Sequence, residues 1–180
     1  MGPIRSRLLR TLLAAVAVAA PSAVTRSQAP QQSVHTYIDP IDRLPRDCYA
    51  QPNAGGNLVL VRGRNDPTLR YWGYSTWDTA GQPWIILNMA VLSQRPAIMT
   101  RFTFYHECAH LVLRSTDEVE ASCYGLKQMR TSGELLPGDE LIVRREHERL
   151  TSLGVKYMGT GAALWQATAA CARQSSAAAR

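Results

Sequence analysis

Two histidines and one glutamate near the middle of the chain have the spacing of a metal-binding helix. Residues 106–110 are His-Glu-Cys-Ala-His, an H-E-x-x-H pattern within an otherwise apolar run. Side chains four positions apart lie on one face of a helix, so the rings of His106 and His110 can reach one ion at the roughly 2.0–2.1 Å typical of zinc–nitrogen bonds. Glu107 lies on an adjacent face, where a carboxylate can act as general base on a water beside the metal. The pattern predicts zinc ligands at His106 and His110 and a catalytic role for Glu107.

A catalytic zinc site needs a third protein ligand and keeps a fourth position for water. An acidic cluster follows the first helix after a short break and begins a second predicted helix. In an antiparallel helical hairpin, residues equally far from the turn face each other, so we expect Glu118 to face the two histidines. Asp117 and Glu120 are alternatives that fit this geometry less well.

The alternative to a metal site is an exposed histidine and glutamate pair on a polar helix. The flanking sequence argues against it, because Phe102, Tyr105, Ala109 and Val112 recur at steps of three and four residues and form an apolar stripe. Burying histidine and glutamate beside such a stripe without a partner would be costly. A metal is therefore the favoured explanation of the pattern.

These residues resemble the gluzincin-type zinc metallopeptidases, in which H-E-x-x-H is followed on a second helix by E-x-x-[A/S]-D or E-x-x-A-N. Thermolysin-like enzymes and the more compact HtpX-like and ImmA/IrrE-like peptidases share this plan. Residues 118–122 match it with Glu118 as the ligand, and Ser122 stands where the family usually has Asp or Asn. The resemblance covers residues 102–127. It implies that residue 122 steadies a zinc-binding histidine, which a short, uncharged serine would do only weakly or through water.

The resemblance implies peptide-bond hydrolysis by a zinc metalloendopeptidase. Zinc would lower the pKa of its bound water towards about 7, and Glu107 would take the proton and return it to the leaving amine. A further side chain usually donates to the oxyanion. The candidates for this donor are Tyr105, Tyr124 and Tyr157.

Two other functions remain open. A secreted zinc-binding structural or interaction domain with little or no peptidase activity is compatible with Ser122, with the small size and with the lack of an obvious oxyanion donor. A metal-free helical domain held by its four cysteines would bind no stoichiometric metal.

The first 29 residues are typical of a secretory signal peptide. Arginines precede an apolar core at residues 8–20, and small residues up to Ala29 offer cleavage points. The apolar stretch is shorter than the roughly twenty residues that cross a bilayer, which makes an uncleaved anchor the weaker alternative. We expect a secreted or periplasmic protein without a stable membrane span.

Removing this segment changes the meaning of the basic charge. The formal net charge of +6 becomes +2 without the four arginines at positions 5, 7, 10 and 26. The other arginines are scattered, without the interleaved aromatic residues of a stacking platform. We therefore expect a peptide or protein substrate and no nucleic-acid partner.

The four cysteines predict two disulfides in an oxidising compartment. Cys108 and Cys123 lie at similar distances from the turn between the two metal-binding helices, so we expect them to pair. Cys48 would then pair with Cys171 and tie the start of the mature domain to its end.

The elements that position these residues predict an α+β fold. Residues 30–57 are loop-rich, residues 58–174 suit one minimal gluzincin-like domain, and residues 175–180 are an expected frayed tail. Three β-like segments at 58–62, 69–75 and 84–89 are separated by turn sequences and predict a small antiparallel meander. This sheet would pack on the H-E-x-x-H helix and the Glu118 helix, with further helices at about 137–153 and 161–173.

One strand and two further histidines complete the expectations. The strand at 84–89 either runs along the cleft and pairs with extended substrate, as the resemblance implies, or is a buried central strand. His147 is flanked by charged residues and is expected on a solvated helix face. His35 lies in the loop-rich segment and is expected to have no catalytic role.

Overall fold

The computed structural model describes residues 37–38, 45–50 and 57–177, all within the compact unit Val34–Arg180. The predicted signal peptide and most of the loop-rich segment lie outside these residues. Within the described ranges, no helix is both long and apolar enough to cross a membrane.

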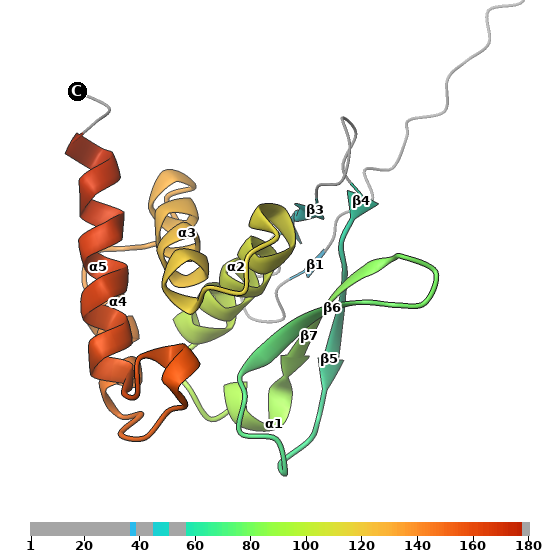
Figure 1. Cartoon of the computed structure of the whole chain (residues 1–180), viewed down its shortest axis with the longest axis horizontal. Helices are drawn as coiled ribbons and strands as arrows, with labels where there is room; N and C mark the ends of the chain where they lie inside the picture. The colour runs from blue at the N-terminus through green and yellow to red at the C-terminus, as the bar shows by residue number, and fades with distance from the viewer. Residues whose placement is uncertain (1–36, 39–44, 51–56, 178–180) are drawn as a thin grey trace, which may run out of the picture. The chain divides into compact units, whose positions relative to one another are not determined.

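The predicted α+β class is confirmed (Figure 1). Two short antiparallel pairs, β1–β2 and β3–β4, precede a three-stranded mixed sheet, and helices follow it. The strands are β1 (Tyr37–Ile38), β2 (Pro45–Arg46), β3 (Tyr49–Ala50), β4 (Asn57–Leu58), β5 (Leu60–Arg64), β6 (Gly73–Trp77) and β7 (Pro83–Asn88). The helices are α1 (Met89–Leu92), α2 (Ile98–Leu113), α3 (Glu118–Thr131), α4 (Asp139–Glu148), the 3-10 helix η1 (Val155–Tyr157) and α5 (Gly161–Ala177).

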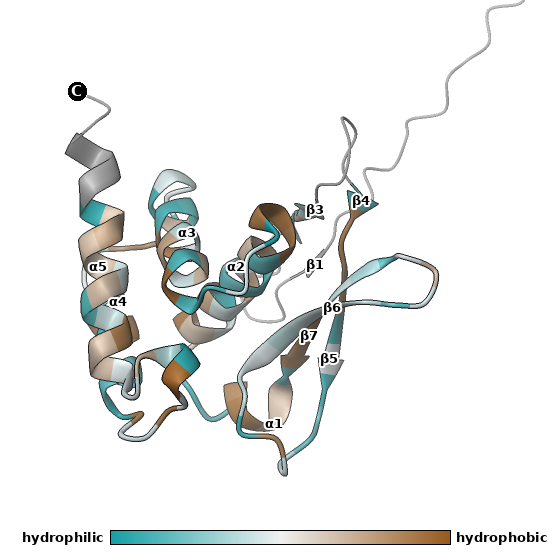
Figure 2. Ribbon diagram, viewed as in Figure 1, coloured by the Kyte–Doolittle hydropathy of each residue, from teal (hydrophilic) through white to brown (hydrophobic). Residues whose placement is uncertain are grey.

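The predicted antiparallel meander is wrong, because the strand order is β5-β7-β6 and β5 runs parallel to β7. Burial explains the order: five of the six β7 residues are buried, whereas β5 and β6 are largely exposed. The most apolar strand is stabilised most in the centre, where both faces are covered. Figure 2 shows the same contrast in hydropathy along these strands.

The Asn88 side chain holds the chain reversal that produces this order. Its amide donates to the carbonyl oxygens of Asp66, Leu69 and Tyr71, at 3.0, 3.0 and 3.1 Å. The loop between β5 and β6 is thereby fastened across the end of β7, so β6 returns on the far side of β7 from β5. No turn sequence near Asn88 predicts these long-range contacts.

Helices α2 and α3 form the predicted hairpin. Arg114 ends α2 in the left-handed conformation, and the Asp117 side chain caps α3 by accepting from the Glu120 backbone N–H at 2.8 Å. Gly125 allows a close crossing, because a Cβ there would lie 3.2 Å from the His106 backbone nitrogen. Helices α2 and α3 therefore lie nearly backbone to backbone where they cross.

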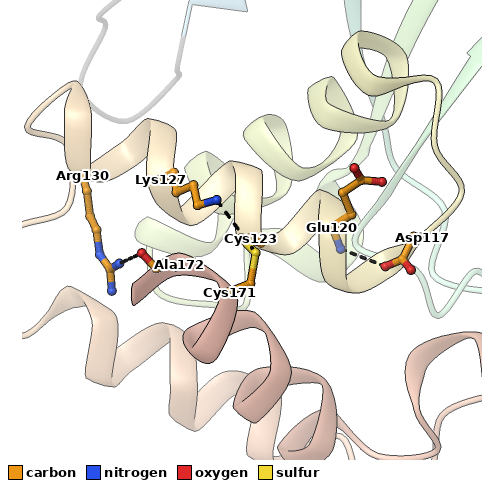
Figure 3. Close-up of a disulfide and its surroundings, with 7 residues drawn as sticks. All are labelled: Asp117, Glu120, Cys123, Lys127, Arg130, Cys171 and Ala172. Carbon is orange, nitrogen blue, oxygen red and sulfur yellow. Dashed lines mark hydrogen bonds between the residues drawn. A yellow bond between two sulfur atoms is a disulfide. The ribbon is translucent and has the colours of Figure 1, made fainter. Parts of the chain in front are cut away.

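Two disulfides are present as predicted, but the predicted pairing is wrong. Cys48 pairs with Cys108, and Cys123 pairs with Cys171 between α3 and α5 (Figure 3). Equal distance from a turn does not make two residues face each other, because each must also lie on the contacting face of its helix. Cys108, two residues from both histidines, lies on the side of α2 away from α3, and it meets the chain next to β3 instead.

Candidate metal centre

Three acceptor atoms from the predicted ligands converge between α2 and α3. His106 Nε2 lies 3.2 Å from His110 Nε2 and 3.0 Å from Glu118 Oε2, and His110 Nε2 lies 3.7 Å from the same oxygen. Among the described residues, this is the group of histidine, cysteine and acidic side chains close enough to share an ion. Asp117 and Glu120, the alternative ligands, are not part of it.

The outer nitrogen of each ring is held by a hydrogen bond. His110 Nδ1 donates to the Ser115 carbonyl oxygen at 2.7 Å, so in the neutral ring the lone pair is on Nε2. His106 Nδ1 lies 3.0 Å from Ser122 Oγ. Ser122 therefore reaches the ring directly and needs no bridging water, because the two helices cross so closely. Both inner nitrogens are directed at the Glu118 carboxylate.

The Glu118 carboxylate is nearly completely buried, at 2 % exposure. Oε2 makes no hydrogen bond of ordinary geometry despite its nearness to the rings, whereas Oε1 is paired with the Lys156 ammonium. Burial alone would raise the pKa of Glu118, but the two histidines and Lys156 outweigh it and lower the pKa below its usual range. Glu118 is thus an anion at neutral pH.

This donor set fits a divalent metal such as zinc. Two half-buried imidazole nitrogens and a buried carboxylate oxygen face one another, and that oxygen has no hydrogen-bond partner of ordinary geometry in the described chain. Ligands about 2.0–2.1 Å from a tetrahedral ion stand about 3.3–3.4 Å apart, which matches the separations of these three atoms. Imidazole and carboxylate are the ligands that zinc takes in catalytic sites.

Glu107 lies beside this cluster and is also buried, at 6 % exposure. Burial is the main cause that raises the pKa of Glu107, and the negative charge of Glu118 adds to it. The two histidines and a hydrogen bond with the Ser75 side chain act in the opposite direction. Strand β6 packs closely here, since a Cβ on Gly73 would meet the Thr103 side chain at 2.9 Å.

All four predicted site residues line one cleft of about 1270 Å³. Strand β6 provides one wall, and the segment from the end of α4 to the start of α5 provides another. Because β7 is central and buried, the alternative interpretation of the strand at 84–89 is the correct one, and β6 is the edge strand at the cleft.

The three tyrosine candidates differ in position. Tyr157 lines the cleft, and burial together with the charges of Glu118 and Glu107 raises its pKa to about 12. Tyr105 instead donates to Glu134 Oε1 at 2.6 Å, and Tyr124 is not part of the cleft lining. Of the three tyrosines, Tyr157 is the one that lines the cleft.

The expected solvated position of His147 is wrong. Its side chain is 2 % exposed and lines the cleft, with burial lowering its pKa to about 4. The flanking Arg145 and Glu148 are exposed, and the neighbouring Glu146 is buried where it pairs with Arg95 and Arg149. The signal was available in Val143, His147 and Leu150, which recur at steps of four and three residues.

Comparisons with known proteins do not assign the chain to a family. No protein-family model matches the chain, and no curated protein or solved structure matches it. The likeness to gluzincins therefore rests on the residues of the α2–α3 hairpin alone.

Proposed function

We propose that this chain is a secreted or periplasmic zinc metalloendopeptidase of the gluzincin type. The observation that carries the proposal is the convergence of His106 Nε2, His110 Nε2 and Glu118 Oε2 in a cleft that also contains the Glu107 carboxylate. A metal site with a buried base beside it, open to a large cleft, suits hydrolysis better than a purely structural role.

Each residue has a distinct part in this reaction. His106, His110 and Glu118 would hold zinc, which when bound supplies Lewis acidity that lowers the pKa of water to about 7. Glu107 accepts the proton of the attacking water, and burial favours this because a raised pKa makes a carboxylate a stronger base. Tyr157 stays protonated at neutral pH and can donate to the developing oxyanion.

The edge of β6 is the proposed place for the peptide backbone. Among the described strands, β6 pairs only with β7, so its other edge keeps backbone donors and acceptors for an extended chain. Gly73 and Ser75 bring this strand against Glu107, which would place a paired peptide near the base.

The first test separates binding from chemistry with three variants. Glu107→Gln should keep stoichiometric zinc by elemental analysis and lose about 10²–10⁴-fold in kcat, because the general base is absent. Glu118→Ala should lose zinc, whereas Glu120→Ala, on the exposed face of α3, should keep both zinc and turnover. Hydrolysis at the wild-type rate by Glu107→Gln would refute the assignment.

A second candidate is a zinc-binding structural or interaction domain. Lys156 favours it, because an ammonium paired with the Glu118 carboxylate weakens the attraction for a dication. Ser122 also favours it, because its uncharged side chain brings no negative charge to His106. A wild-type protein that binds one zinc but cleaves no member of a broad peptide library would support this candidate over the peptidase.

A further inference from the structure

The cleft contains a third histidine, His147, which is buried and which the proposed reaction does not use. The Nδ1 of His147 donates to the Val143 carbonyl oxygen at 2.8 Å, one turn earlier in α4. No described residue is a hydrogen-bond partner of the other ring nitrogen, Nε2. Since the ring lines the cleft, Nε2 is the polar atom that remains for a ligand.

Aromatic side chains surround this ring. Trp72 and Phe102 meet it edge to face, with ring centroids 5.3 and 5.1 Å away, and Trp165 lies at 5.7 Å. The Phe102 ring is also 6.1 Å from the ring of His106, so these side chains lie next to the candidate metal centre. We call the cleft wall formed by Trp72, Phe102, His147, Leu150 and Leu164 the His147 pocket.

The hydrogen bond to Val143 determines whether His147 Nε2 donates or accepts in the pocket. A ring whose Nδ1 carries the proton presents a lone pair at Nε2 and accepts a hydrogen bond there. Burial lowers the pKa of His147 to about 4, which keeps the ring neutral at pH 7. His147 is therefore an acceptor in the cleft and cannot serve as the oxyanion donor.

We propose that the His147 pocket binds an aromatic substrate side chain that ends in a hydrogen-bond donor, tyrosine or tryptophan, next to the scissile bond. Apolar and aromatic walls favour the ring of such a side chain, and the single acceptor at His147 favours a hydroxyl or indole N–H over a plain phenyl group. Phenylalanine would leave the buried nitrogen without a partner, and a site loses affinity when a substrate leaves its polar group unpaired. The proposal rests on the proposed function, because it assumes a substrate anchored at the metal.

The test compares small metal-chelating probes and needs no turnover. L-tyrosine hydroxamate, L-meta-tyrosine hydroxamate and L-phenylalanine hydroxamate share one chelating group and differ only in the ring hydroxyl. For the zinc-loaded chain, calorimetry should show the tyrosine probe binding about tenfold more tightly than the phenylalanine probe. The meta isomer should resemble phenylalanine, because its hydroxyl points to a different place.

A variant removes the acceptor while keeping an aromatic ring. In His147→Phe the preference for tyrosine should vanish, and the affinity for phenylalanine hydroxamate should change by less than about threefold. Should this variant fail to fold, the three probes on the wild-type chain still decide the matter.

The outcomes distinguish this proposal from the one on which it rests. Equal binding of the tyrosine and phenylalanine probes overturns the His147 assignment and leaves the metal site standing. Binding of neither probe to a chain supplied with zinc overturns the metal centre and the pocket proposal together. Tighter binding of phenylalanine than of tyrosine also overturns the assignment.

Discussion

Helix α2 contributes to two largely buried polar clusters, and the polar atoms of the two clusters find hydrogen-bond partners in different ways. On one side, the Glu134 carboxylate accepts from Arg46 Nε at 2.5 Å and from the Tyr105 hydroxyl at 2.6 Å. On the other side, the carboxylate of Glu118 faces two imidazole nitrogens, and its Oε2 has no hydrogen bond. Tyr105 and His106 are neighbours in sequence but belong to opposite clusters.

The difference lies in the balance of donors and acceptors. In the Arg46–Tyr105–Glu134 cluster, a guanidinium and a hydroxyl supply the donors that one carboxylate needs, so the cluster is complete within the chain. The His106–His110–Glu118 cluster brings two imidazole nitrogens to a buried carboxylate oxygen that has no hydrogen bond of ordinary geometry, and a buried acceptor without a donor is costly. The first cluster stabilises the fold, and the second has an arrangement that a bound cation would complete.

The largest effect is expected when the carboxylates of Glu118 and Glu134 are each replaced by an amide of the same shape. With zinc at about a thousand times its dissociation constant, the wild-type free energy of unfolding should rise by about 4 kcal/mol. Glu118→Gln should abolish this gain. Glu134→Gln should keep it and instead destabilise the metal-free chain by about 1.5–3 kcal/mol, because Arg46 loses its hydrogen bond to a charged carboxylate. Urea unfolding with zinc and with EDTA measures both. Equal loss of the zinc effect in the two variants would break the comparison.

His147 is a third buried polar group, and here the expected effect depends on pH. Its pKa falls from the ordinary 6.5 to about 4 on folding, so the unfolded chain binds the proton more readily. The free energy of unfolding should therefore fall by about 3 kcal/mol as the pH decreases from about 6.5 to about 4. Urea unfolding in EDTA, wild type against His147→Phe, isolates this part, since the other titrating groups cancel in the difference. An identical pH dependence in both proteins would contradict it.

A substitution of Ser122 tests how much the hydrogen bond between its hydroxyl and His106 Nδ1 contributes to metal affinity. Ser122→Ala should weaken zinc binding by about 10- to 100-fold, because the ring loses the partner that orients it. Competition with a chromogenic chelator measures the affinity. Thr131→Ala, at the exposed end of the same helix, is the matched control and should leave it unchanged. An unchanged affinity in Ser122→Ala would mean that the crossing of α2 and α3 alone orients the ring.

The smallest expected effect concerns the Arg46–Tyr105–Glu134 cluster. Tyr105→Phe removes one donor to Glu134 while Arg46 remains, so it should destabilise the chain by about 1 kcal/mol without altering zinc affinity. Thermal unfolding and the same chelator competition check the two parts. A loss of zinc affinity comparable to that of Ser122→Ala would show that the two clusters are coupled through α2.

The sequence by itself determined what depends on helical periodicity and on composition. The four-residue spacing of His106 and His110 placed both rings on one face, and the position of Glu118 after the turn made it the expected partner for them. The α+β class and the presence of two disulfides also followed from local patterns.

Only the tertiary structure decided which faces meet. Strand order depended on the burial of β7 and on the long-range anchor of Asn88, and the cysteine pairing depended on which side of each helix met a neighbour. The burial of His147 and the contact of Lys156 with Glu118 arose in the same way. A local pattern states how a side chain is directed from its own element, but the partner it meets depends on how distant elements pack.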